Sequence, residues 1–319
     1  MILKKIHSQT IHSFKQQREQ EKVVEMCAIF GVSKQAYYAQ LKTNCKQSIQ
    51  EKTVIDLVKK ERQIWKKGSG RNLHKCLEKE FEKHQFSIGR DKFFTILRNN
   101  GLLIKHRNNK ARTTQSYHFF NKYPNLVTYD FICTRANEIW VSDITYIWLE
   151  KERYFCYLSM ITDMYSRKII GYCIHENLSA EGCLVALKMA LKQRASKAEK
   201  LIHHSDRGVQ YCCDAYVKLL QKNAVEISMT QTGDPKENAI AERVNKTIKC
   251  EFTTDNQIHF KDVETAKNEV KINIEYYNKK RPHRSVNMLT PNVAHQQKGE
   301  LKRKWKTYYK KQQNDVNLK

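Results

Sequence analysis

The hydrophobic pattern of the first hundred residues predicts helices. No proline interrupts residues 1–123, and Lys, Glu, Gln and Leu are abundant there. Gly31 breaks the pattern once, and Ser33 can cap the helix that follows. A helix, a glycine turn and a capped second helix is the plan of a DNA-binding helix-turn-helix, although any helical hairpin would show the same pattern. Apolar positions recur with helical spacing in Glu21–Phe30, Lys34–Leu41, Val54–Arg62, Leu73–Phe81 and Arg90–Asn100.

From Glu138 the pattern changes to short runs rich in Ile, Val, Tyr, Trp and Thr. Three such runs predict an antiparallel meander, and alternating helices and strands follow. The order β-β-β-α-β-α-β-α-α predicts an α/β fold, a ribonuclease-H-like mixed sheet flanked by helices. We expect strands at Ile139–Leu149, Tyr154–Asp163, Lys168–His175, Leu201–His204 and Val225–Met229, and helices at Ser179–Arg194, Val209–Lys222, Lys236–Phe252 and Val263–Asn278.

These changes in pattern divide the chain into five parts. All-α modules precede the α/β core: a helix-turn-helix-like segment in residues 1–48 and a second helical DNA-binding module in residues 49–115. A basic linker in residues 116–135 leads into the catalytic core, residues 136–295. A basic tail with interleaved aromatics, residues 296–319, is either a disordered end or a nonspecific DNA contact.

Charge indicates the kind of partner. The chain has 58 Lys and Arg against 33 Asp and Glu, a net charge of +25. Residues 1–129 contain 26 basic and 10 acidic residues, so +16 of that surplus lies on the helical modules. Such an excess repels itself in a compact fold and is typical of proteins that bind a polyanion. An enzyme of neutral metabolites would not need it.

Composition excludes other classes of protein. No apolar run approaches the 18 residues of a membrane span, and no secretory signal is visible, so we expect a cytoplasmic protein without a membrane partner. The ten cysteines include no C-x-x-C pair. Reduced thiols therefore explain them better than disulfides or a structural zinc site.

Three acidic residues stand out by their positions. Asp143 interrupts a β-prone run, Asp206 directly follows a strand, and Glu242 lies within a helix. Neighbouring strands lie ~4.8 Å apart, so acids on adjacent strands can meet, and a helix packed across their ends can supply a third. Taken singly, Asp206 is better explained as a helix cap and Glu242 as part of a solvated helix face.

Together the three acids predict a metal-dependent site. Clustered carboxylates repel one another unless a cation is present, and oxygen-only ligation suits Mg²⁺ or Mn²⁺. Two such ions ~3.5–4 Å apart promote phosphoryl transfer. Thirty-five residues separate Asp206 from Glu242. Asn238, Glu242 and Lys249 share one helical face, which places Lys249 to contact a DNA phosphate.

The residues around the acids carry a family resemblance. Asp143, Asp206 and Glu242 resemble the D-D-x35-E triad of retroviral-integrase-like transposases. Around the second acid, His204–Tyr211 matches the family motif H-S-D-x-G-x-Q-Y, and around the third, Asn238–Glu242 matches N-A-x-x-E, with Lys249 at the position of the family's basic residue. Asp163–Gly171 matches D-x-x-S-R-x-x-x-G. Tyr277–His283 and Leu289–Pro291 match Y-N-x-x-R-P-H…L-T-P. The chain is identified as a member of the IS-three family of bacterial insertion-sequence transposases, of the OrfB type. It departs from the family pattern at Val286, Asn287 and Cys250.

The resemblance implies a function and its partners. Asp143, Asp206 and Glu242 would hold two Mg²⁺ or Mn²⁺ ions and catalyse strand cleavage and strand transfer at the ends of an insertion sequence. It also implies a homo-multimer that pairs terminal inverted repeats and joins them to target DNA. The active form in the family is commonly a fusion with an upstream-frame DNA-binding protein, and this chain looks like the downstream product. We expect DNA contacts from Lys249, Asn238, Arg167, Arg281, His283, Lys34, Arg107 and Arg112.

Two other readings remain open. A DNA-binding regulator of transposition with a vestigial core would keep the helical modules but would not need an intact triad. A ribonuclease-H-like nuclease would explain the acids but not the upstream helices. A retroviral integrase would be similar in its core, but no cysteine pair here has the spacing of its zinc-binding module.

Overall fold

The chain forms two compact units. The computed structural model describes residues 10–13, 23–104, 119–127, 131–194, 199–231, 237–252 and 259–305. The first unit comprises Met1–Lys60 and Lys79–Leu102, and the second comprises Glu61–Glu78 and Leu103–Lys319. Residues 61–78, which the sequence assigns to the second helical module, therefore pack with the α/β part of the chain.

The first unit contains the predicted glycine turn between two helices. Helix α2 spans Val23–Ile29 and α3 spans Lys34–Glu61. Gly31 lies between them with φ +61°, a backbone conformation that favours glycine. The hydroxyl of Ser33 accepts a hydrogen bond from the Ala36 amide at 3.2 Å, as the capping prediction requires. A small core holds the turn, made of Ile11, Met26, Cys27, Val32 and Tyr37.

Helix α3 differs from the sequence prediction. We expect two helices, Lys34–Leu41 and Val54–Arg62, but the structure has one continuous helix. Residues 42–53 lack apolar periodicity because they are mostly exposed, yet they contain no glycine or proline and many good helix formers. The boundary that the sequence suggests between residues 48 and 49 falls inside this helix.

Two further helices follow. Helix α4 spans Gly70–Lys83 and α5 spans Arg90–Asn99. Phe81 and Phe93 pack with ring centroids 6.1 Å apart in the first unit. Gly101, at φ +65°, ends α5, and the Leu102 amide donates to the Leu97 carbonyl at 2.7 Å. The predicted termination of this helix is confirmed.

The second unit is built on a six-stranded mixed sheet. Strands β1, β2 and β3 form the predicted antiparallel meander, and β4 and β5 run parallel to β1. The strand order is β3-β2-β1-β4-β5, with the short β6 paired to β1. The strands are β1 (Ile139–Leu149), β2 (Tyr154–Asp163), β3 (Ile169–His175), β4 (Ile202–Ser205), β5 (Glu226–Met229) and β6 (His259–Phe260).

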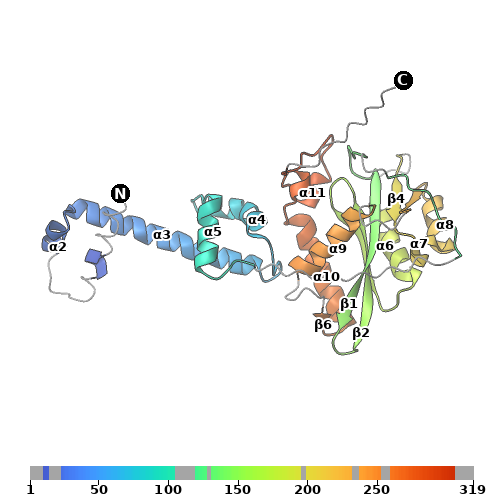
Figure 1. Ribbon diagram of the computed structural model, residues 1–319, viewed down its shortest axis with the longest axis horizontal. Coiled ribbons are helices and arrows are strands. Elements are labelled where there is room, and N and C mark those ends of the chain that lie inside the picture. Colours follow the sequence, from blue (N-terminus) through green and yellow to red (C-terminus); the bar gives the residue numbers. More distant parts are fainter. Residues whose placement is uncertain are drawn as a thin grey trace, which may run out of the picture. The chain divides into compact units, whose positions relative to one another are not determined.

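Helices cover both faces of this sheet, as Figure 1 shows. Helix α6 packs on β2 and β3, whereas α9 packs on β1 from the other side. This order and sheet topology confirm the predicted ribonuclease-H-like fold. The helices are α6 (Ala180–Lys192), α7 (Val209–Cys212), α8 (Asp214–Lys222), α9 (Ala239–Glu251), α10 (Val263–Lys279), the 3-10 turn η1 (Arg284–Val286) and α11 (Pro291–Ala294).

One predicted helix, Val209–Lys222, is broken at Cys213, which has extended backbone angles. The cause lies in the core. Tyr211 and Tyr216 are both buried, and their rings lie 5.4 Å apart beside His203. In a continuous helix, residues five apart point in directions about 140° apart, so both rings could not face the same core. In the described part of the chain, no helix has the length and apolar character needed to cross a membrane.

Candidate active site

Asp143 lies near the middle of the central strand, at a gap in the sheet. On this edge β1 pairs with β4 at Ile139–Val141 and with β6 only from Trp148 onward. Among the described residues, no strand pairs with this edge of β1 in between. The half-buried side chain of Asp143 lies beside this gap, on the face that carries α9.

The other two acids come from the elements that flank this gap. Asp206 is the first residue after β4 and accepts a hydrogen bond from the Gly208 amide at 3.0 Å, which shapes the turn into α7. Glu242 lies in the first turn of α9, and its side chain is exposed. Strand, strand end and helix thus supply one acid each, the arrangement that the sequence predicts.

The charge environment of Asp143 shows that the three acids are neighbours. Burial most of all, then the negative charge of Asp206 and, more weakly, that of Glu242 together raise the pKa of Asp143 to about 7. Two hydrogen bonds oppose this rise, one from Asn245 and one from the Ile144 amide. Asp143 is therefore a carboxyl group that ionises with difficulty unless a positive charge compensates it.

The start of α9 is fastened to two strands. Asn238, directly before the helix, donates from Nδ2 to the Ser142 carbonyl on β1 at 2.9 Å. His204 on β4 lies 3.0 Å from the carbonyl of Glu237, and because a carbonyl can only accept, Nε2 of His204 carries the proton. The other ring nitrogen lies 2.8 Å from the Ser228 hydroxyl on β5. Asn238, expected at the DNA, instead holds the helix that carries Glu242.

Asn245 is a site residue that the sequence analysis misses. Its side chain donates from Nδ2 to Oδ2 of Asp143 at 2.7 Å, across 102 residues of sequence. A weak signal exists, because Asn245 follows Glu242 by three residues and Asn238 by seven, on the same helical face. Nothing in the sequence alone distinguishes it from a solvated asparagine.

Lys249 lies in the last turn of α9, on the side of Asp143. It is half-buried, and burial lowers the pKa of its ammonium group while the charge of Asp143 opposes that change. The structure thus brings Asp143, Asp206, Glu242 and Lys249 into one charged neighbourhood.

The donor chemistry of this neighbourhood suits an oxygen-preferring divalent cation. The three acids offer carboxylate oxygens, and Asp143 has a raised pKa that a cation would lower. Within the described ranges, no three His, Cys, Asp or Glu side chains are close enough to form a ready-made metal cluster. The charges of Asp206 and Glu242 nevertheless act on Asp143, and a bound cation would offset this repulsion.

Three predicted DNA contacts in the core point inward. Arg281 and His283 are only 6% and 8% exposed. Arg281 forms a paired contact with Glu251, and the ring of His283 packs edge-on against Tyr277 at 5.1 Å. Arg167 donates to the Met164 carbonyl and to the Ser285 hydroxyl. From sequence alone, a basic side chain that binds a DNA phosphate cannot be distinguished from one that bonds to a carboxylate or carbonyl inside the protein. In this structure the side chains of Arg281 and Arg167 bond to such internal partners.

The remaining predicted contacts lie on the helical modules. Lys34 is exposed at the first position of α3. Arg107 and Arg112 lie outside the described residues, as do residues 306–319 of the basic tail.

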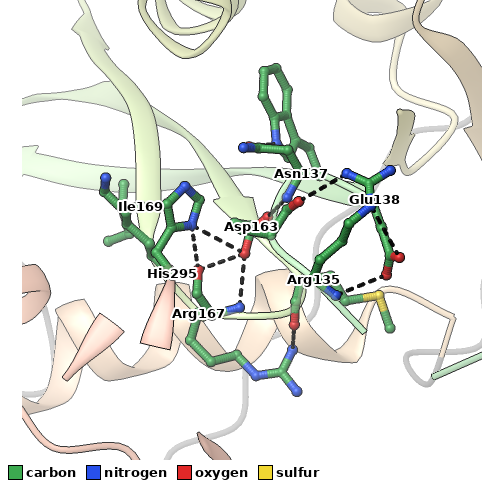
Figure 2. Close-up of polar contacts among 12 residues, drawn as sticks. Arg135, Asn137, Glu138, Asp163, Arg167, Ile169 and His295 are labelled. Atoms are coloured by element: carbon green, nitrogen blue, oxygen red, sulfur yellow. Dashed lines mark hydrogen bonds and ion pairs between the residues drawn. The ribbon is translucent and has the colours of Figure 1, made fainter. Parts of the chain in front are cut away.

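The D-x-x-S-R segment forms a structural turn around the buried carboxylate of Asp163, as Figure 2 shows. Asp163 ends β2 with no exposed surface, and it accepts hydrogen bonds from the amides of Asn137 and Ser166 at 2.7 and 2.8 Å. His295 lies 3.5 Å from the same carboxylate and 2.9 Å from the Ser166 hydroxyl. Asp163 therefore ties the β2–β3 turn to the residues that precede β1 and follow α11.

Comparison with known proteins finds a family match in the α/β part of the chain and relatives among insertion-sequence proteins. Two family profiles, both described as "Integrase core domain", match residues 134–235 and 223–291. The chain is 30% identical to an insertion element IS600 31 kDa protein of Shigella sonnei, over 83% of this chain and 96% of that protein. It is 32% identical to the transposase InsF for insertion sequence IS3A of Escherichia coli, over 49% of this chain and 53% of that protein. A solved structure of the HTLV-2 integrase catalytic core domain in complex with magnesium is 15% identical, with a TM-score of 0.38, over 50% of this chain and 97% of that one.

Proposed function

The chain belongs to the IS-three (IS3) family of insertion-sequence transposases, and we propose that Asp143, Asp206 and Glu242 are its DDE triad. In this proposal they catalyse Mg²⁺-dependent strand cleavage and strand transfer at the ends of the element. The observation that carries the proposal is geometric: Asp143 lies on the central strand, Asp206 directly follows the neighbouring strand, and the helix of Glu242 is bonded to Asp143 through Asn245 at 2.7 Å. The raised pKa of Asp143, to which burial and the charges of Asp206 and Glu242 contribute, agrees with it. Three acids from three separate elements have no packing reason to share one gap in a sheet, and such clusters are typical of functional sites.

The residues of the site have distinct tasks. Asp143, Asp206 and Glu242 would hold the cation, with Mn²⁺ as an alternative to Mg²⁺. Two such ions, when bound, help to activate the attacking hydroxyl and stabilise the leaving 3′-oxygen in an in-line displacement. Asn245 orients the Asp143 carboxylate through its 2.7 Å hydrogen bond. Lys249 offers its positive charge to a DNA phosphate near the scissile bond.

The helical modules would select the DNA. Helices α2 and α3, with the Gly31 turn and the Ser33 cap, have the features of a helix-turn-helix, and Lys34 begins the helix that would enter the major groove. A net charge of +16 in residues 1–129 supports contacts to many phosphates. Pairing of two element ends requires a multimer on DNA, and an upstream-frame protein could supply further DNA binding.

The triad is tested by Glu242→Gln, which keeps the shape of the side chain and removes its charge. We expect Mg²⁺-dependent cleavage and joining of end-sequence oligonucleotides to fall by a factor of about a thousand or more, since one charged site group is lost. Binding to the same oligonucleotides should change by less than about twofold, because an exposed charge contributes little to affinity. Glu264→Gln, at an exposed position in the first turn of α10, is the matched control and should retain full activity. A fully active Glu242→Gln enzyme refutes the triad.

The role of Lys249 is tested on the same helix. Lys249→Glu should weaken cleavage, whereas Lys246→Glu, at an exposed position, should have a small effect. If Lys249→Glu and Lys246→Glu weaken cleavage equally, Lys249 contributes only as one of many surface charges.

A further inference from the structure

The carboxyl-terminal end of α9 is held by a segment from far upstream in the chain. Glu251, the last residue of the helix, accepts hydrogen bonds on Oε2 from Nε1 of Trp65 and Nε of Arg281, both at 2.7 Å. Its Oε1 accepts from Nη2 of Arg281, also at 2.7 Å. The backbone amide of Lys67 donates to the Glu251 carbonyl at 2.7 Å, which satisfies one of the carbonyls left open at a helix end. We call Trp65, Glu251 and Arg281 the α9 clamp.

The clamp is buried and packed. Trp65 has no exposed surface, and Arg281 is 6% exposed. The Trp65 ring stacks near Phe252 at 6.5 Å and packs against Tyr276 at 5.7 Å, while the Arg281 guanidinium lies 5.8 Å from the Trp65 ring. The half-buried Glu251 carboxylate accepts three hydrogen bonds from Trp65 and Arg281, which fix its direction because each lost bond leaves a polar group with little access to water unsatisfied.

A second contact anchors the upstream segment itself. Glu61, the last residue of α3, accepts hydrogen bonds from the Tyr276 hydroxyl near the end of α10 and from Nζ of Lys280, directly after that helix. Glu61, Trp65 and Lys67 therefore all contact the catalytic unit, and the segment that they span belongs to that unit.

The clamp completes the fastening of the helix that carries Glu242 and Lys249. Asn238 fixes the start of α9, and Asn245 fixes its middle against Asp143. Without the clamp, the helix remains held at these two points and, beyond them, by the buried side chain of Ile248, so loosening is expected only beyond Asn245. Lys249 lies two residues from Glu251 and would move most, whereas Glu242, in the first turn, would move least.

From these contacts we propose that Trp65 is a positioning residue for the active site. It directs Glu251, which with Arg281 holds the last turn of α9 and so places Lys249 beside the Asp143 neighbourhood. The proposal rests on the proposed function in one respect, the role of α9 in catalysis. Whether Trp65 holds α9 in place can be measured separately, in an experiment that does not depend on catalytic activity.

The test uses Trp65→Phe in the full chain, which keeps an aromatic ring and removes the indole N–H. Amide hydrogen exchange should accelerate about tenfold or more in the last two turns of α9, as expected for a lost buried hydrogen bond to a charged group, and stay unchanged in β1 and α6. The cleavage rate should fall about tenfold, with the affinity for end DNA within about twofold. Tyr165→Phe, which removes a buried donor to the Gly299 carbonyl elsewhere in the unit, should change neither.

Two further variants separate positioning from loss of folding. A Cβ on Gly68 would lie 2.6 Å from the Trp65 ring, so Gly68→Ala displaces the ring while every clamp donor remains present. It should reproduce the exchange pattern of Trp65→Phe. In a Glu251→Gln background, Trp65→Phe should add less than about twofold to the loss of rate, since residues that act through one contact are not additive.

The outcomes distinguish this proposal from the triad. Unchanged exchange in α9, or acceleration spread evenly over the sheet, overturns the clamp even if Glu242→Gln is inactive. Faster exchange confined to α9 supports the clamp even if Glu242→Gln proves active, in which case the triad assignment fails alone.

Discussion

Asn245 on α9 donates a hydrogen bond to Asp143 on β1 at 2.7 Å. The bond joins the catalytic helix to the central strand one turn beyond Glu242. It also favours the ionised form of Asp143, against burial and the neighbouring charges that raise the pKa of this carboxyl to about 7. The same amide thus sets both the position and the charge state of the central acid.

Removal of this amide should shift the pH dependence of the reaction. In Asn245→Ala the pKa of Asp143 rises further, because a hydrogen bond to the charged form is lost. The acidic limb of the cleavage rate should therefore move to higher pH, by about one unit. The rate of oligonucleotide cleavage between pH 5.5 and 9 measures the shift, and Lys246→Ala on the exposed side of α9 is the control. An unmoved limb would show that Asn245 does not tune Asp143.

Asp143 itself should destabilise the metal-free protein at neutral and alkaline pH. Its folded-state pKa of about 7 lies above the unfolded value of about 3.9, so the folded state binds the proton more tightly. Stability then falls as pH rises from about 4 to about 7, and the penalty is complete above that range. Asp143→Asn should be the more stable protein at pH 8 in chelator, on the order of 1–2 kcal/mol after allowance for partial solvation.

Urea unfolding at pH 4 and pH 8 checks this expectation. The difference between Asp143→Asn and the wild type should be small near pH 4, where the folded carboxyl is protonated and the unfolded one is about half protonated. Addition of Mg²⁺ should stabilise the wild type and have little effect on the variant, because the cation binds the folded state through the carboxylate. A variant that is less stable than the wild type at both pH values contradicts the argument.

The order of elements in the catalytic unit could be predicted from sequence because each strand carries its own local pattern. Ile139–Leu149 and Tyr154–Asp163 are runs of β-branched and aromatic residues, and both strands have the predicted bounds. Helix α3 and the break at Cys213 could not be predicted in the same way. The middle of α3 is exposed and so lacks the regular spacing of apolar residues that predicts a helix. The break at Cys213 depends on two tyrosines, Tyr211 and Tyr216, that pack in the same core.

The acids of the candidate site could be predicted, but their supports could not. Asp206 and Glu242 each have an ordinary local explanation, and the three acids stand out only together, through their spacing and the motifs around them. Asn245 and Glu251 act through partners 102 and 186 residues away, Asp143 and Trp65. Only the fold brings such pairs together. For the same reason, Arg281 could not be distinguished in sequence from a phosphate contact.

His204 should act through one ring nitrogen more than the other. His204→Gln can place an amide N–H near the position of Nε2 and keep the bond to the Glu237 carbonyl, whereas His204→Asn can only reach the Ser228 side. The glutamine variant should cleave within about threefold of the wild type and the asparagine variant about tenfold more slowly, the cost of one buried hydrogen bond at the start of α9. Single-turnover cleavage with saturating DNA measures the difference. If the asparagine variant cleaves faster than the glutamine variant, the contact of His204 with Ser228 on β5 is the more important of the two.

Gly171 on β3 should be the position at which a single methyl group is least tolerated. A Cβ there would lie 2.2 Å from the Ala186 carbonyl oxygen of α6 and 3.1 Å from Cβ of Ala190, so the strand and the helix would have to separate. Backbone atoms cannot rotate away, and we expect Gly171→Ala to lower the free energy of unfolding by about 2–3 kcal/mol or more. Gly89→Ala is the matched change, since a Cβ there meets no atom within 4 Å and φ is −67°. Its effect should stay within about 1 kcal/mol, because the lost freedom of the unfolded chain offsets the weaker cap. Calorimetric unfolding of both variants decides the matter: equal stability would mean that α6 is not in contact with β3 at Gly171.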